Sequence, residues 1–140
     1  MIYSPVELIE KHMDIFALKA TQSQLFMGCR NHCIIPMGLK SIGLYAGQVE
    51  PPLRQPHLDV VTSFTTLLGD QILVSASKDK NLRGWGTQQE PSQESLTQLP
   101  NLNQNQAHND HITVVHSDAG QTQLFSGSRD GIVNVWSAVG

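Results

Sequence analysis

Two stretches of the chain, ILVSASKDKNLRGW at residues 72–85 and LFSGSRDGIVNVW at residues 124–136, share one pattern. Each ends in tryptophan, with an aspartate six positions earlier and a serine four positions before that aspartate. A histidine stands 28 residues before each tryptophan, and all four residue types recur at one spacing of 51 residues. Self-similarity at a fixed period indicates a repeat architecture. The two sets are His57, Ser75, Asp79 and Trp85, and His108, Ser126, Asp130 and Trp136.

A degraded third copy precedes these two. The segment LFMGCRN at residues 25–31 aligns with the start of the second stretch, and His12 falls close to the histidine position. Met27 then takes the serine position, Asn31 the aspartate position and Met37 the tryptophan position, which lies 48 residues before Trp85. A period of roughly 40–50 residues is typical of a four-stranded propeller blade.

Alternating apolar residues predict strands around residues 16–20, 60–64 and 112–116, each followed by a turn of small or polar residues. Two further strands are expected, at residues 41–47 (SIGLYAG) and 95–99. The Gln/Asn-rich segment after residue 99 is expected to be a loop between blades. No long amphipathic helix is evident, so the chain is predicted to be all-β.

Composition excludes several functions. The 140 residues carry a net charge of -3, which argues against an electrostatic grip on nucleic acid or anionic lipid. No apolar run is long enough for a membrane helix, and the acidic first ten residues do not resemble a secretory signal. Two cysteines make no disulfide scaffold, and no phosphate-binding G-x-x-x-x-G-K-[ST] loop occurs. We expect a cytoplasmic, non-enzymatic protein with no cofactor.

The His, Ser, Asp and Trp pattern resembles the WD40 repeat, which is matched well by residues 57–85 and 108–136 and poorly by 12–37. Two departures are the lack of a glycine before either histidine and the absence of aspartate after either tryptophan. The resemblance implies a partial β-propeller over residues 1–140, with about three four-stranded antiparallel blades. Its repeats would cover about 12–50, 57–100 and 108–140, and further blades would be needed to close the ring.

A narrower resemblance covers PPLRQPHLDVVTSF (51–64), QILVSASKDKNLRGW (71–85), QLPNLNQNQAHNDHI (98–112) and the 124–136 stretch. These segments are similar to the C-terminal WD40 tail of kinesin-4 motors. The resemblance implies a cytoskeletal interaction module that binds microtubules or motor cargo, although two insertions split its introductory Pro-His segments. The alternative is the substrate-receptor propeller of a ubiquitin ligase or another enzyme complex.

The repeated residues have a structural interpretation. A buried indole N–H needs an acceptor, which the serine hydroxyl can supply. In the WD40 pattern the serine would also bond the histidine, and the aspartate would orient the other imidazole nitrogen. Such a network satisfies every buried polar group and fixes the histidine loop against the sheet.

Two chemical interpretations were weighed against this one. The Ser–His–Asp set could form a hydrolase triad, but it occurs twice in tandem, and active sites rarely do so. Cys29, His32 and Cys33 form a C-x-x-H-C cluster with no fourth ligand nearby in sequence. We therefore expect no catalytic residue and no metal.

The residue before the turn aspartate, or before Asn31, is basic in every repeat. These residues, Arg30, Lys78 and Arg129, are predicted to lie along one rim of the blades. The simpler and favoured interpretation is that they are solvated turn residues paired with the aspartates near each strand start, Asp14, Asp59 and Asp110. The alternative is a surface for an acidic partner such as a tubulin tail.

Overall fold

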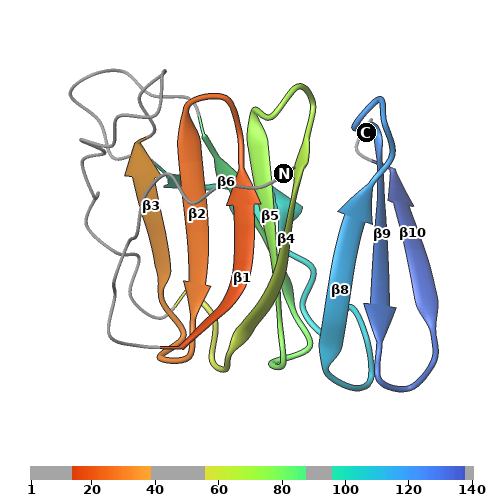
Figure 1. The fold of residues 1–140 in the computed structure, drawn as a ribbon. Coiled ribbons are helices and arrows are strands. Elements are labelled where there is room, and N and C mark those ends of the chain that lie inside the picture. Colours follow the sequence, from red (N-terminus) through yellow and green to blue (C-terminus); the bar gives the residue numbers. More distant parts are fainter. Residues whose placement is uncertain (1–13, 39–55, 88–95, 138–140) are drawn as a thin grey trace, which may run out of the picture.

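The computed structural model describes residues 14–38, 56–87 and 96–137. They form three antiparallel sheets that stand side by side (Figure 1). The first contains β1 (Ile15–Ala20), β2 (Gln24–Cys29) and β3 (Ile34–Gly38). The second contains β4 (Val61–Leu67), β5 (Ile72–Ser77), β6 (Leu82–Gly86) and β7 (Thr97–Gln98). The third contains β8 (Ile112–Ser117), β9 (Gln123–Ser128) and β10 (Val133–Ser137).

The sheets repeat one another in their irregularities as well as in their strands. The first strand of each sheet carries a register shift just after its first residue, at Ile15, Val61 and Ile112. The turn between the second and third strands holds a residue at positive φ: His32 at 72°, Lys80 at 74° and Gly131 at 84°. This left-handed conformation costs a side chain energy and costs glycine little. The three sheets are therefore copies of one structural unit.

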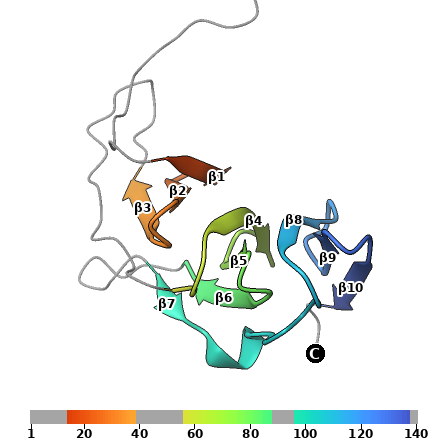
Figure 2. The ribbon, with the colours of Figure 1, turned by 90° about the horizontal axis from the view of Figure 1, so that it is seen from below.

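The first strands of the three sheets lie next to one another on the inner side of an arc, and the later strands step outward (Figure 2). A cluster around Phe26, Ile34, Leu73 and Trp85 fills the space between the first two sheets. Leu67, Val74, Leu82, Leu124 and neighbouring residues fill the space between the second and third. A Cβ at Gly28 would come within 2.8 Å of the Val61 side chain, so only glycine allows the first two sheets to approach this closely.

Polar contacts also hold the second and third sheets together along their inner strands. The Thr62 hydroxyl donates to the Ile112 carbonyl at 2.6 Å, and the Thr65 hydroxyl donates to Ser117 Oγ at 3.0 Å. At one end of these strands, Asp70 and Gln121 exchange two hydrogen bonds of 2.8 and 2.9 Å. These bonds fix how the two sheets align.

The predicted all-β class and the antiparallel blades are confirmed. Within the described ranges only the second sheet has four strands; the strand predicted at 41–47 lies outside the described residues. The strand predicted at 95–99 is shorter, at Thr97–Gln98, and a short 3₁₀ helix, η1 (Pro100–Leu102), follows it. Proline favours such a helix start because its φ is already fixed. None of the helices among the described residues is long and apolar enough to cross a membrane.

Candidate functional site: the buried networks and the basic turns

The histidine of the second sheet is the centre of a complete hydrogen-bond network. His57 Nδ1 lies 2.9 Å from Asp79 Oδ2, and His57 Nε2 lies 2.7 Å from Ser75 Oγ. The Trp85 indole N–H donates to the same Ser75 Oγ at 2.9 Å. If Nδ1 carries the proton, it donates to the carboxylate, the serine hydroxyl donates to Nε2, and every buried donor has an acceptor. The network joins the loop before β4 to β5, β6 and the turn between them.

The carboxylate of Asp79 also organises the local backbone. It accepts hydrogen bonds from the amides of Leu58 and Asn81, both at 2.9 Å. Burial alone would raise the pKa of Asp79, but the hydrogen bond and charge of His57 together with these two amides outweigh it and lower that pKa below 3.8. Asp79 is therefore held as a carboxylate that fastens the histidine loop to the β5–β6 turn.

The same geometry resembles a Ser–His–Asp triad, yet it is closed to substrate. Ser75 has no exposed surface and His57 is 1% exposed. The serine oxygen already bonds both the indole N–H of Trp85 and His57 Nε2. A nucleophile needs access to a reacting carbon. The arrangement can hold the fold together, but it offers no place for a reaction.

The equivalent network in the third sheet is incomplete, which corrects the sequence-based expectation for Asp130. His108 Nε2 lies 2.8 Å from Ser126 Oγ, and the Trp136 indole N–H donates to that oxygen at 2.9 Å. His108 Nδ1, however, is buried and has no hydrogen-bond partner among the described residues. Asp130 instead accepts the amide of Ile132 at 3.0 Å, as Asp79 accepts that of Asn81.

The difference follows from what covers each turn. The second sheet's turn is covered by the connection to the third sheet, where the Gln106 amide donates to Asn81 Oδ1 at 2.7 Å and Leu82 pairs with Gln104. The side chain of Asp79 is accordingly only 4% exposed. Asp130 is exposed, so its carboxylate stays hydrated. A hydrogen bond to the imidazole would therefore lower its free energy less than it does for the covered Asp79.

The first sheet replaces the network with apolar packing. Its register places Met37 opposite Leu25, as Trp85 lies opposite Leu73 and Trp136 opposite Leu124. Met27 lies opposite Ile35, at the place of the network serine. Met27 and Met37 are both 3% exposed and share a cluster with Cys29 and Ile35. No polar group at these positions needs a partner, so a histidine network is not required here.

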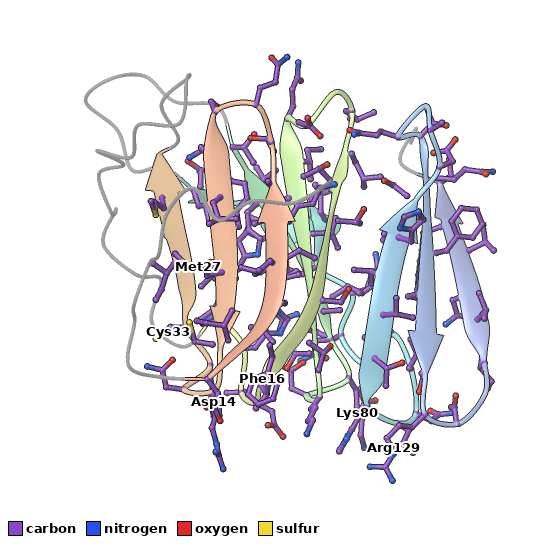
Figure 3. The ribbon with its side chains drawn as sticks, in the orientation of Figure 1. Asp14, Phe16, Met27, Cys33, Lys80 and Arg129 are labelled. Carbon is purple, nitrogen blue, oxygen red and sulfur yellow. The ribbon has the colours of Figure 1, made fainter. Side chains whose placement is uncertain are left out.

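The three basic turn residues lie at one end of the molecule. The turns that hold them connect β2 to β3, β5 to β6 and β9 to β10, and all three are at the lower end in Figure 1. Figure 3 shows Lys80, Arg129 and Asp14 at that end. The structure thus brings together on one rim three exposed side chains that are far apart in sequence: Arg30, Lys78 and Arg129.

The expected pairing with aspartates holds for one of the three cations. Arg30 Nη1 lies 3.0 Å from Asp14 Oδ2, although both side chains are largely exposed. Among the described residues Lys78 has no ion pair, and Arg129 approaches His111 Nδ1 at 3.4 Å. Asp59 and Asp110 instead accept the amide of the following residue, at 2.7 Å in both cases. Of the three, only Lys78 has no side-chain partner among the described residues.

Lys80 adds a cation to this rim that the sequence reasoning missed. The hydrogen bond from the His111 amide is the main cause that lowers the pKa of Asp110, and the charges of Arg129 and Lys80 contribute. Both cations therefore lie close enough to Asp110 to act on it. The signal was present in the turn sequence KDKN, where Lys80 stands two residues after Lys78.

The described residues contain no group of three His, Cys, Asp or Glu side chains that could hold a metal ion. In the predicted C-x-x-H-C cluster, Cys29 is buried in the apolar cluster with Met27 and Met37, and its amide donates to the Cys33 carbonyl at 3.0 Å. His32 occupies the left-handed turn position. The three residues thus form a turn rather than a ligand set.

Known proteins share both the fold and one repeat. The WD domain, G-beta repeat model (WD40) matches residues 100–137, which contain His108, Ser126, Asp130 and Trp136. A solved structure titled "Structure of U3-55K" superposes with a TM-score of 0.74 at 23% identity, over 93% of this chain and 38% of that chain. Another, "Crystal structure of RRP9 WD40 repeats", gives a TM-score of 0.75 at 22% identity, over 93% of this chain and 37% of that chain.

No curated protein sequence matches the chain. Nothing in these comparisons links it to kinesin-4 motors. The chain spans less than two-fifths of the length of the two solved chains. What the chain shares with them is the arrangement of its sheets. It therefore has the fold of WD40 propeller blades and contains a WD40 repeat at residues 100–137.

Proposed function

We propose that the chain is a non-catalytic protein-interaction scaffold whose basic rim, formed by Arg30, Lys78, Lys80 and Arg129, binds an acidic protein segment. The observation that carries the proposal is the gathering of cations from separate repeats on one edge of a chain whose net charge is -3. Asp14, Asp110 and Asp130 lie at the same end, so the rim is of mixed charge. An acidic partner would be attracted by the cations that no neighbouring carboxylate pairs, foremost Lys78. The burial of Ser75, His57 and the Asp79 side chain supports a scaffold rather than an enzyme.

The finer form of this proposal is the tail of a kinesin-4-like motor, which would use the rim on the acidic tails of tubulin or on motor cargo in the cytoplasm. Its support is the sequence resemblance of residues 51–64, 71–85, 98–112 and 124–136. A substrate-receptor propeller of a ubiquitin ligase would also be a scaffold, and it would select a substrate by its surface. The two differ in whether microtubules bind.

The test is a charge reversal of the rim. In the full chain, Arg30→Glu, Lys78→Glu and Arg129→Glu are combined, and binding is measured to poly-glutamate by fluorescence anisotropy. Cosedimentation with microtubules, with and without their acidic tails, tests the finer form. We expect capture to be lost while the thermal unfolding temperature stays unchanged, because exposed charges contribute little to stability. The control is Lys19→Glu with Arg83→Glu, which reverses two cations outside these turns and is matched in charge to the double variant Lys78→Glu with Arg129→Glu.

Unchanged poly-glutamate binding in the rim variant would contradict the scaffold proposal. Binding to poly-glutamate that is lost as expected, without any binding to microtubules, would contradict only the motor-tail form. Raising the salt concentration should weaken the capture, since exposed charge pairs more than about 10 Å apart are screened at 0.1 M ionic strength.

A further inference from the structure

A polar cavity of about 470 Å³ opens between the first and second sheets, at the end of the molecule opposite the basic rim (Figure 1). One wall is the β1–β2 turn with the start of β2, residues 21–24. The other wall is the β4–β5 turn, residues 69–71, together with Thr87 after β6. Apart from Gly69, every residue that lines this turn cavity has a polar side chain. Hydrogen bonds and charge would therefore select its ligand.

The corresponding place between the second and third sheets is closed. Gln22, Asp70 and Gln121 are equivalent, because each lies two residues before the second strand of its sheet. The Asp70 amide donates to Gln121 Oε1 at 2.8 Å, and Gln121 Nε2 donates to Asp70 Oδ1 at 2.9 Å. Among the described residues Gln22 makes no such bond to Asp70, and the turn cavity lies between them. The first two sheets thus leave a space where the next two are joined.

Gln24 brings a buried amide side chain to this cavity. It is 5% exposed and shares one face of β2 with Phe26, which packs between the first and second sheets. Its backbone bonds Thr21, but its side chain has no hydrogen-bond partner among the described residues. The equivalent residue of the second sheet is the apolar Ile72. Burying an amide costs free energy unless it is hydrogen-bonded, so Gln24 indicates a ligand that supplies the missing bond.

Asp70 brings a fixed carboxylate from the opposite wall. Its Oδ1 accepts the Thr66 hydroxyl at 2.6 Å and Gln121 Nε2 at 2.9 Å, while Oδ2 has no partner among the described residues. These two hydrogen bonds are the largest causes that lower the pKa of Asp70 below 3.8; burial opposes them, and the charge of Lys19 lowers the pKa further. Asp70 is therefore ionised at neutral pH, with one oxygen held in place and the other able to accept from a ligand.

We propose that the turn cavity binds an arginine side chain of a partner protein, with its guanidinium between Asp70 Oδ2 and the side-chain oxygen of Gln24. A guanidinium presents five N–H donors in one plane and no acceptor, so it can bond a carboxylate on one wall and an amide oxygen on the other. The ammonium of lysine carries its three donors on one atom and suits two walls less well. Because the cavity lies at the end away from the basic rim, the inference extends beyond the proposed function.

The probe is the blocked tripeptide Gly-Arg-Gly, titrated into the ¹⁵N-labelled full chain. Its comparison is the same tripeptide with citrulline, whose neutral urea group has nearly the shape of a guanidinium. We expect saturable shifts of the Gln24 side-chain amide and of the Gly69 backbone amide, with the Gly131 amide at the basic rim unchanged. The arginine peptide should bind about tenfold more tightly, because a charged donor strengthens a hydrogen bond to a carboxylate.

Two variants of the protein test the two walls separately. Gln24→Ile introduces the type of residue that the second sheet has at this position, so it should fold and bind the arginine peptide on the order of fivefold more weakly. Asp70→Asn should lose the preference for arginine over citrulline. Asp118→Asn is the matched control, because this aspartate also accepts hydrogen bonds within a turn but does not line the cavity. It should leave binding unchanged.

A third variant tests the sign of the charge that the cavity prefers. Lys19 acts on Asp70 by its charge, yet the two form no ion pair among the described residues. Lys19→Gln removes a nearby positive charge and should therefore tighten the arginine peptide while leaving the citrulline peptide unchanged.

The proposal is wrong if the Gln24 and Gly69 signals do not shift saturably. Equal binding of the two peptides to the wild-type chain would also overturn it, because the cavity would then prefer a neutral polar group. Unchanged arginine binding in Gln24→Ile and Asp70→Asn, with amide spectra showing both folded, would place the arginine elsewhere on the surface. Since Asp70 also joins the second and third sheets, Gln24→Ile keeps the test decisive if Asp70→Asn fails to fold.

Discussion

The second and third sheets carry the same four network residues at the same spacing, yet only the second completes the network. His57 bonds both Ser75 and Asp79, whereas His108 bonds Ser126 alone and keeps a buried nitrogen without a partner among the described residues. The second sheet has a neighbour on both faces, and among the described residues the third has one only. The residue types allow the hydrogen-bond network to form, but the histidine bonds both the serine and the aspartate only where the next unit buries the turn.

The same contrast holds for the tryptophans. Trp85 is covered by Leu96 and the first sheet, while Trp136 borders an open cavity. The outward-facing Val133 and Val135 of β10 are 66% and 59% exposed, and their counterparts Leu82 and Gly84 are buried. How far a repeat unit in this chain is buried therefore depends on the neighbours that cover it.

The largest expected difference between the two sheets concerns the tryptophans. Trp85→Ala should lower the free energy of unfolding by about 3–5 kcal/mol, because it empties a buried site and removes a donor from Ser75. Trp136→Ala should cost clearly less, since that side chain is already partly in water. Urea unfolding of both variants measures this. Equal losses would show that the third sheet is as well packed as the second.

The next largest difference in unfolding free energy is expected between variants of Asp79 and Asp130. Asp79→Ala leaves His57 Nδ1 buried without an acceptor and should cost about 1–3 kcal/mol in unfolding free energy. Asp130→Ala removes only an exposed turn contact to the Ile132 amide, so a smaller loss is expected. The comparison of the two variants by urea unfolding is the measurement. A loss in Asp130→Ala as large as that in Asp79→Ala would mean that Asp130 reaches His108 in solution.

The pH dependence offers a third comparison. The folded-state pKa of Asp79 is lowered from 3.8, so its contribution to stability is present above pH 3.8 and is lost as pH falls through the lower folded value. The wild-type chain should therefore lose its stability advantage over Asp79→Asn across that acidic range. Thermal unfolding at a series of pH values, with Asp130→Asn as the control, tests this. A constant difference between wild type and Asp79→Asn would contradict the assigned hydrogen bonds of the Asp79 carboxylate to His57 and to the amides of Leu58 and Asn81.

The smallest effects on stability are expected for the aspartates at the strand starts, where the two sheets have the same hydrogen bond. Asp59 and Asp110 each accept the amide of the next residue at 2.7 Å. Asp59→Ala and Asp110→Ala should therefore shift the thermal unfolding temperature slightly and by similar amounts. Clearly unequal shifts would show that the surroundings of the strand starts differ as much as those of the turns.

The sequence predicted the residues of the network and of the rim, but not all of the contacts that these residues make. The equal spacing of the two sets identified the repeated residues, and the WD40 resemblance implied the contacts of the histidine and tryptophan with the serine, which lie within one sheet and its entry loop. The missing Asp130 contact could not be read from spacing, because it depends on what covers the turn. Lys80 was overlooked because no cation recurs at its position in the other two repeats, which have His32 and Gly131 there.

The sequence by itself determined the all-β fold, the three repeated units and the replacement of the first network by Met27 and Met37. These depend on local alternation and on residues that meet within one sheet, so a period and a strand pattern suffice. Only the tertiary structure decided which histidine is satisfied, which tryptophan is covered and where a cavity remains. Those outcomes depend on the packing of one sheet against the next, and each sheet's burial is set by its neighbours and not by its own residues.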